Sequence, residues 1–355
     1  MELVPDEVLA NCFARLSPPE QALARLVCRR FYSILSTDAA LQLRKWQGLL
    51  EPWLCVMGGV QEHHHEPMVE LYDFLADKWR VMLPNPPTIT FDFCCAVVKE
   101  RLYKLGGFMG FLDFNVDKVP LMDVYNFRKH TWEKGRQMDE MREAFACGVI
   151  NDRIYVAGGL VRKPFLQENL RVRSAEVYIP ETDSWESIPA MKECRSCCAS
   201  AVVGQKLYVI GGYGTDSILR SVEVFDPAIK TWEFRAQTPA SWIIAGCAAI
   251  GHLIYFVVSS ALEMEAVAVY DTQTDEWYVK GVIPLESLLN GSKGSLWGCT
   301  VLASKGKLYV LGGASSCSSG GLKCGLVYDP TLETWSPLKM MRSRRHGCAG
   351  VVIYL

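Results

Sequence analysis

Residues 207–232 read LYVIGGYGTDSILRSVEVFDPAIKTW: an apolar strand that ends in a glycine pair, an aromatic–aspartate turn, and a tryptophan. The same order recurs six times along the 355-residue chain. The recurring tryptophans are spaced between 45 residues (232 to 277) and 58 residues (277 to 335): Trp79, Trp132, Trp185, Trp232, Trp277 and Trp335. A period of roughly fifty residues holds four short strands, which is the size of one β-propeller blade. The sequence therefore predicts a mainly β fold with six blades.

The repeated residues have a physical reason. One four-stranded blade cannot bury both of its faces, whereas stacked blades can, if large aromatic side chains fill the wedge between neighbours. Glycine pairs such as Gly211-Gly212 indicate strand ends where the backbone needs a positive φ or a close approach. Repeat five has Ser259-Ser260 at this place, which predicts a different strand end. A β-sandwich with chance dipeptides is the alternative that this regularity disfavours.

The two ends of the repeat region complement each other. Three strands are available to the first blade, in Leu54–Gly59, Val69–Tyr72 and Lys78–Met82, and nothing before Leu54 supplies a fourth. At the other end, Arg345–Val352 repeats the start of a blade, and the chain stops at Leu355. We therefore expect the C-terminal strand to close blade one by pairing with Leu54–Gly59, because closure removes two exposed sheet edges.

Charge and hydropathy argue against nucleic-acid and membrane partners. The formal net charge is −2, and the basic residues form no stripe. The N-terminus lacks a basic segment followed by an apolar run, so no cleaved secretion signal is expected. The segment Trp242–Leu262 is apolar enough to resemble a membrane span, but it coincides with the first two strands of repeat five. We therefore expect a hairpin there.

The fourteen cysteines raise the question of disulfides or zinc. Four of them stand three residues before the last apolar residue of a blade's first strand: Cys95, Cys147, Cys247 and Cys299. Cys348 takes the same place at the C-terminal end. Small, easily buried residues suit strands that crowd around a propeller axis. The pair Cys194 and Cys197 has no second pair at zinc spacing, and the adjacent His63, His64 and His65 point to different sides. We expect reduced thiols, a cytoplasmic and/or nuclear location, no metal and no cofactor.

Residues 1–50 carry no repeat and form the first of two predicted domains, the second being residues 52–355. A first helix is expected over Pro5–Leu16, a second from Ser17 to about Ser36, and a third from Thr37 to about Gly48. Fifty residues of helix bury little apolar surface by themselves. Leftover exposed apolar side chains normally indicate a partner.

Two motifs carry a family resemblance. The stretches LVPDEVL (3–9) and LVCRRF (26–31), with Leu16 between them, resemble the F-box motif. The glycine pair, the Tyr-Asp turn and the tryptophan of residues 52–355 resemble kelch repeats. The order F-box then kelch is most abundant in plants.

This resemblance implies the substrate-recognition subunit of a cullin–RING ubiquitin ligase. The F-box would bind a Skp-type adaptor, and through it a cullin, while the kelch propeller captures an unidentified protein for ubiquitylation. No catalytic residue is expected in this chain. The family places a set of residues against the adaptor or in the F-box core, two roles that the sequence does not separate: Pro5, Leu9, Leu16, Val27, Cys28 and Phe31. The family usually has Trp where this chain has Phe31, which suggests a weaker contact.

The segments just before each blade's first strand predict the substrate site. Arginine and tryptophan side chains converging on one rim are typical of protein-binding hot spots, and arginine forks suit carboxylates or phosphates. The candidate substrate-binding residues are Arg142, Arg195, Ser196, Trp242, Trp297, Arg345 and His346. For the arginines an alternative stays open, in which they hold neighbouring blades together through carbonyl groups.

Two other classes of protein share the repeat. A propeller enzyme needs axial metal ligands or acid–base groups, and six histidines, three of them in one run, make a multi-histidine centre hard to assemble. A scaffold that binds other proteins would need no F-box-like first fifty residues.

Overall fold

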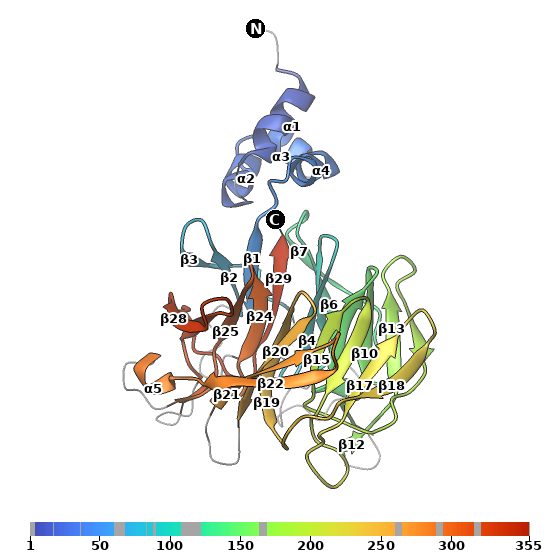
Figure 1. Cartoon of the computed structure of the whole chain (residues 1–355). Helices are drawn as coiled ribbons and strands as arrows, with labels where there is room; N and C mark the ends of the chain where they lie inside the picture. The colour runs from blue at the N-terminus through green and yellow to red at the C-terminus, as the bar shows by residue number, and fades with distance from the viewer. Residues whose placement is uncertain are drawn as a thin grey trace.

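The computed structural model describes residues 4–16, 18–35, 37–59, 68–82, 84–87, 90–107, 122–162, 169–259, 265–288, 294–315 and 321–354. In this part of the chain, four helices precede a ring of sheets and sit at one end of it (Figure 1). The helices are α1 (Asp6–Ala14), α2 (Pro18–Arg25), α3 (Arg29–Leu35) and α4 (Asp38–Trp46). The first strand begins at Pro52.

The sequence predicted one helix where the structure has α2 and α3. The chain leaves α2 through two tight bonds, from the Leu26 amide to the Leu23 carbonyl and from the Val27 amide to the Ala24 carbonyl. The Cys28 carbonyl then accepts the Tyr32 amide and starts α3. Such three-residue bonds tighten the backbone and end the α-helix. The expected cap residue Ser17 lies outside the described residues.

Six antiparallel four-stranded sheets form the blades within the described residues, as the sequence predicted. Blade 1 consists of β29 (Ala349–Tyr354), β1 (Pro52–Met57), β2 (Val69–Asp73) and β3 (Lys78–Val81). Blade 2 consists of β4 (Cys94–Val98), β5 (Arg101–Leu105), β6 (Met122–Asn126) and β7 (Thr131–Lys134). Blade 3 consists of β9 (Ala146–Ile150), β10 (Arg153–Ala157), β13 (Ala175–Ile179) and β14 (Ser184–Ile188).

The remaining blades follow the same order. Blade 4 consists of β15 (Ala199–Val203), β16 (Lys206–Ile210), β17 (Val222–Asp226) and β18 (Thr231–Arg235). Blade 5 consists of β19 (Ile243–Ile250), β20 (Leu253–Ser259), β21 (Glu265–Asp271) and β22 (Glu276–Val282). Blade 6 consists of β24 (Thr300–Ser304), β25 (Lys307–Leu311), β27 (Gly325–Asp329) and β28 (Thr334–Leu338).

Short elements extend the blades. A three-stranded sheet is built on blade 3 from β8 (Arg142–Glu143), β11 (Leu160–Arg162) and β12 (Asn169–Arg171). A two-stranded sheet and a single-turn helix lie beside blade 6: β23 (Gly294–Ser295), β26 (Ala314–Ser315) and α5 (Leu285–Leu288).

The C-terminal strand closes the ring. β29 pairs with β1 in antiparallel register from Pro52↔Tyr354 to Met57↔Ala349. This confirms the predicted closure of blade one, although β29 pairs with Pro52–Met57 and not with Leu54–Gly59 as expected. The inner strands then contact one another in a circle, β29, β4, β9, β15, β19, β24 and back to β29.

The repeated aromatics join neighbouring blades. Five of these indole N–H groups, those of Trp79, Trp132, Trp185, Trp232 and Trp277, donate to a carbonyl at the end of the preceding blade, such as Trp185 to Arg136 at 2.8 Å and Trp232 to Pro189 at 2.6 Å. The indole of Trp79 donates to the Lys339 carbonyl at 2.8 Å and so joins blade 1 to blade 6. The tryptophan therefore recurs because it both fills the wedge and fixes the angle between blades.

The glycine pairs and the apolar segment of repeat five also follow the predictions from the sequence. The glycine pairs have positive φ, for instance 58° at Gly211 and 85° at Gly212. In repeat five, β20 continues to Ser259 where the other blades have their first glycine. The apolar segment that begins at Trp242 forms the β19–β20 hairpin, and within the described residues no helix is long and apolar enough to cross a membrane.

The cysteines fall into two groups rather than the one expected. Cys95, Cys147 and Cys247 lie inside the inner strands β4, β9 and β19. Cys299 and Cys348 instead lie one residue before β24 and β29.

Candidate functional site

The faces of the propeller differ in what they carry. β1 begins next to the helices, and antiparallel β29 begins at the other end of the ring (Figure 1). The inner strands therefore start on the face away from the helices. The loops before them, which hold the predicted substrate residues, lie on that far face.

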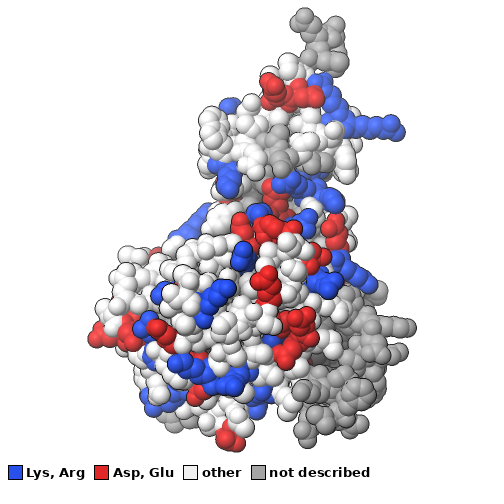
Figure 2. Space-filling model, turned by 90° about the vertical axis from the view of Figure 1, so that its right-hand side faces the viewer, with Lys and Arg blue, Asp and Glu red and all other residues white. Residues whose placement is uncertain are grey.

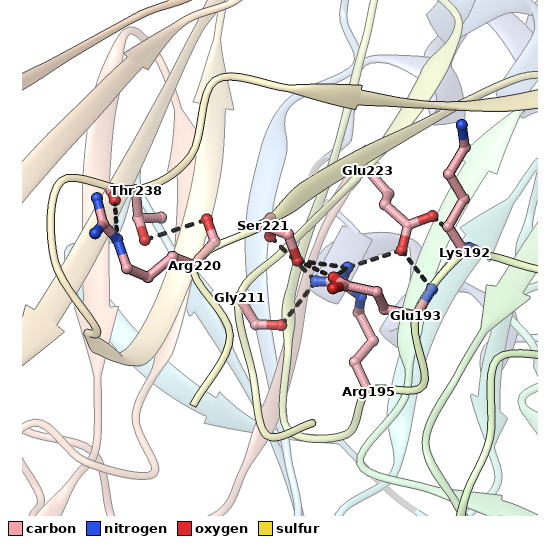
Figure 3. A network of polar contacts seen from close by, with 8 residues as sticks. All are labelled: Lys192, Glu193, Arg195, Gly211, Arg220, Ser221, Glu223 and Thr238. Carbon is pink, nitrogen blue, oxygen red and sulfur yellow. Dashed lines mark hydrogen bonds and ion pairs between the residues drawn. The ribbon is translucent and has the colours of Figure 1, made fainter. Parts of the chain in front are cut away.

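The three arginines of these loops are interior residues. Arg142, Arg195 and Arg345 are each exposed by 1% or less. In blade 4, the Arg195 guanidinium donates to the Glu223 carboxylate at 2.8 Å and to the Gly211 and Ser221 carbonyls at 3.0 and 3.1 Å (Figure 3). Their burial contradicts the assignment of these arginines as substrate contacts and favours a structural role through carbonyl groups. The acceptors lie in the arginine's own blade, however, and not in the neighbouring blade as the alternative expected.

The same bracing arrangement recurs in blades 1 and 3. Arg142 donates to Glu176 at 2.7 Å, and Arg345 donates to Glu70 at 2.8 Å. Each glutamate also accepts amide protons from the loop that leads into the blade; Glu223, for example, accepts those of Lys192 and Glu193 at 2.6 and 3.1 Å. We call these three Arg–Glu pairs the struts. They fix the loops of the far face from inside.

Ser196 and Trp242 are also buried, at 1% and 8% exposure. The Ser196 hydroxyl accepts the Arg171 Nε–H at 3.0 Å, and the ring of Trp242 lies 5.8 Å from that of Trp277 in the core between blades 4 and 5. Neither side chain is available as a substrate contact, so both assignments are wrong. Trp242 looked like a binding residue because its repeat-mates are not aromatic, but it fills space between blades 4 and 5.

Trp297 and His346 do reach the surface. Trp297 is 55% exposed, and its ring centroid lies 4.6 Å from that of the half-buried His346. Asp92 and Cys197 are exposed at matching places in their loops. We call Asp92, Cys197, Trp297 and His346 the axial rim. The predicted substrate roles of Trp297 and His346 remain predictions.

Backbone bonds hold the axial rim in place. The Ala144 amide donates to the Asp92 carbonyl and the Cys197 amide donates to the Ala144 carbonyl, both at 2.8 Å. The three residues share a positive φ near 50°. Asp92 was overlooked as a site residue, although its matching position in the loop before β4 was a usable signal.

Electrostatics at the axial rim are mild. Neighbouring loops remove part of the water around Asp92 and raise the pKa of its carboxyl, and His346 opposes this rise. Burial lowers the pKa of the His346 imidazole, while Asp92 opposes that change. A carboxylate beside a largely neutral imidazole and an indole suits mixed polar and apolar contacts with a protein segment.

The thiols near the axis are unreactive. Burial raises the pKa of Cys247 to about 12 and that of Cys348 to about 11, so both are protonated at neutral pH. No group of three or more His, Cys, Asp or Glu side chains in the described residues is placed to hold a metal ion. The run His63–His65 lies outside the described residues.

The helices separate the two roles that the sequence left joined. Leu9, Leu16 and Phe31 pack around a buried cluster that contains Phe13 and Ile34. Pro5, Val27 and Cys28 are exposed. The first three residues therefore build the core, while the last three are accessible to a partner.

More apolar side chains accompany Val27 on the surface. Val8 is 48% exposed, Leu23 67%, Leu26 81% and Val27 68%. An ion pair of 2.6 Å between Arg30 and Asp6 joins the start of α1 to the start of α3. We call Val8, Leu23, Leu26 and Val27 the apolar helix face. Leu23 and Leu26 were missed because each fits a helical stripe that reads as core.

Comparison with known proteins gives matches for both parts of the chain. Residues 1–39 match the F-box domain, and residues 141–192, 194–238 and 298–342 match the Kelch motif. The F-box/kelch-repeat protein At2g44130 of Arabidopsis thaliana is 30% identical over 269 residues, which cover 64% of this chain and 63% of that protein. This chain thus spans less than two thirds of that relative's length. The F-box/kelch-repeat protein At1g67480 of the same plant is 25% identical, with 92% and 82% covered.

A solved structure supports the fold. The protein in "Structure of YjhT" superimposes with a TM-score of 0.62 at 15% sequence identity, covering 76% of this chain and 89% of that one. At this identity the similarity concerns the fold alone.

Proposed function

Because this chain is an F-box/kelch-repeat protein, we propose that it is the substrate-recognition subunit of an SCF-type cullin–RING ubiquitin ligase. Its helices bind a Skp-type adaptor, which joins it to a cullin, and its propeller holds the protein to be ubiquitylated. The chain itself is non-catalytic, since ubiquitin transfer occurs on other subunits. We place it in the cytoplasm, the nucleus or both, where such ligases work.

One observation carries the proposal: four large apolar side chains of a small helical unit are close to half exposed or more. Leaving such side chains in water is unfavourable by about 1.5–3 kcal/mol each. A partner that covers the apolar helix face recovers this free energy. The distribution over α1, α2 and the turn before α3 matches the F-box region of residues 1–39.

Co-purification with the adaptor tests the proposal. Val27→Asp and Leu26→Asp place a charge on the apolar helix face without touching the cluster around Phe13. Both should abolish adaptor recovery while the propeller stays folded. The matched control is Leu332→Asp, because Leu332 is 69% exposed on the propeller. If both helix variants recover the adaptor as well as the control does, the chain is a scaffold and not a ligase subunit.

We place the substrate-binding site on the far face of the propeller. Trp297 is the largest exposed side chain of the axial rim, and truncation of such an anchor costs on the order of 2 kcal/mol in binding. Trp297→Ala should therefore stabilise the captured substrates in cells without loss of adaptor binding. Unaltered turnover of every substrate identified would place the substrate site elsewhere.

A further inference from the structure

A cleft lies between the helices and blade 2. Its volume is about 100 Å³. The helices contribute Gln21, Arg25, Leu35, Thr37 and Arg44, and blade 2 contributes Lys99, Glu100, Arg128 and His130 among others. Figure 2 shows lysine, arginine and acidic side chains gathered at this narrow junction. The cleft is one of few places where both parts of the molecule supply side chains to the same space.

Basic groups outnumber acidic ones in the cleft. Glu100 is the one carboxylate among the described residues that line it, and it is paired with Arg128. Lys99 is engaged on blade 3, 3.0 Å from Glu181. Arg44 donates to the Ala14 and Leu49 carbonyls at 3.0 and 2.8 Å. Arg25 and His130 therefore lack a carboxylate of their own in the cleft.

Arg25 and His130 meet across the junction. Arg25 Nη2 donates to the Leu35 carbonyl at 2.8 Å, Nη1 contacts His130 Nε2, and the buried Nε has no acceptor among the described residues. On its other side, His130 Nδ1 lies 3.2 Å from the Tyr125 hydroxyl. The Arg25 contact requires a neutral imidazole, whose Nε2 accepts.

A positive charge on Arg25, or on His130 when it is protonated, is unfavourable in this cleft. Burial lowers the pKa of Arg25, and burial together with the adjacent Arg25 lowers that of His130. Desolvation without an opposite charge disfavours the cationic form. An anion that displaced the Arg25–His130 contact would reverse this effect, since it would accept from Arg25 and from a protonated His130 at once.

We propose that this cleft binds a small oxyanion of the phosphate class, held by Arg25 from the helices and His130 from blade 2. A water molecule occupies about 30 Å³, so the cleft has room for one such anion or a few waters. The guanidinium fork matches the spacing of phosphate oxygens. Bound there, the anion links the helices to the propeller and stiffens the junction. This inference does not depend on the proposed ligase role.

The experiment titrates the full chain with inorganic phosphate, at ionic strength matched with chloride, and follows binding by calorimetry and by the melting temperature. A parallel titration uses glycerol 3-phosphate, which separates free phosphate from an esterified phosphate group. We expect saturable binding and a rise in melting temperature with at least one of the two. The variants are Arg25→Gln and His130→Gln, and the control is Arg344→Gln on the far face.

Each cleft variant should weaken binding about tenfold or more, the loss expected for one charge-assisted hydrogen bond, while the control binds like the native chain. Arg25 also holds the Leu35 carbonyl, so His130→Gln is the decisive variant if Arg25→Gln fails to fold. Absence of saturable binding to the native chain would overturn the proposal. So would equal binding by His130→Gln, or an equal loss in the control, which would indicate non-specific attraction.

Discussion

Blades 4 and 6 have the same four strands but fill one interior position with opposite chemistry. In blade 4, Glu223 on β17 accepts the Arg195 guanidinium at 2.8 Å, and both side chains are fully buried. In blade 6, Leu326 on β27 takes the glutamate's register position and shares an apolar cluster with Leu296. The fold therefore does not require the ion pair. The strut instead ties the incoming loop to the blade, through hydrogen bonds that leucine does not form.

Blade 2 lies between these two cases. Asp123 takes the glutamate position, but the loop has Thr90 where blades 1, 3 and 4 have arginine. The buried Lys104 on β5 supplies the cation, 3.6 Å from Asp123. A buried carboxylate thus keeps a buried cation, although the element that supplies the cation changes. Desolvation explains this, because an uncompensated buried charge is costly.

The largest loss of stability is expected at blade 1, where both the strut and the closing strand come from the C-terminal segment. Deleting residues 346–355 removes β29 and leaves β1 as an open edge. We expect a loss of several kcal/mol, a large part of the total stability of about 5–15 kcal/mol, with aggregation or unfolding. Soluble yield and thermal unfolding measure the effect, with removal of residues 1–3 as the control. Cooperative melting near the native temperature would contradict closure by β29.

The second prediction concerns the strut of blade 4. Glu223→Leu removes the buried carboxylate and leaves the Arg195 guanidinium with only the partly exposed Glu193, 3.0 Å away, so it should cost up to about 3–5 kcal/mol. The double variant Arg195→Met with Glu223→Leu gives blade 4 the chemistry of blade 6 and should recover most of that loss. Urea denaturation of the two variants and the native chain measures the coupling. A double variant as unstable as the single one would show that the loop bonds, and not the charge, dominate.

Whether a feature of the fold could be predicted from the sequence depends on how far apart in the chain the interacting residues stand. Blade number and ring closure follow from residues that repeat in order, such as Trp232 and the glycine pair before it. Burial of Arg195 was not predicted, because its partner Glu223 stands 28 residues later. A signal did exist: in blades 1, 3 and 4, which have the arginine, the third strand carries a glutamate, as at Glu223, whereas blade 6 has Leu326 and no arginine.

On the helices and the rim, the sequence identified the relevant segments but not which of their side chains are buried and which are exposed. Leu9 and Val27 belong to one motif, yet Leu9 packs against the cluster around Phe13 and Val27, in the turn between α2 and α3, is exposed. Trp242 and Trp297 stand in equivalent loops, but Trp242 is buried between blades 4 and 5 and Trp297 is exposed. Such choices depend on tertiary packing, which local patterns do not encode.

The third prediction concerns the apolar cluster that blade 6 has in place of a strut. Leu296→Ala in blade 6 removes a side chain that is 1% exposed and should cost about 2–5 kcal/mol, since the cavity collapses only in part. Urea denaturation of Leu296→Ala and of the native chain measures this loss. A cost below about 1 kcal/mol would mean that the loop closes over the gap.

The smallest effect is a pH dependence that the strut measurements must be corrected for. His130 and His346 have lowered pKa values, the first through burial and the nearby Arg25, the second through burial. As the pH falls through the ordinary histidine pKa of about 6.5, the unfolded chain takes up protons that the folded chain excludes, so stability decreases. Above that pH the folded chain gains nothing further.

Replacing each histidine by glutamine should flatten this decrease, and His130→Gln should flatten it more. His346 faces Asp92, whose raised pKa means that the folded chain takes up a proton there earlier than the unfolded chain does. This uptake stabilises the folded chain as the pH falls and offsets part of the His346 effect. Urea midpoints at pH 7.5 and 5.5 measure both slopes. Equal slopes for the two variants would show that Asp92 does not act on His346, and unchanged slopes would place the titration on other groups.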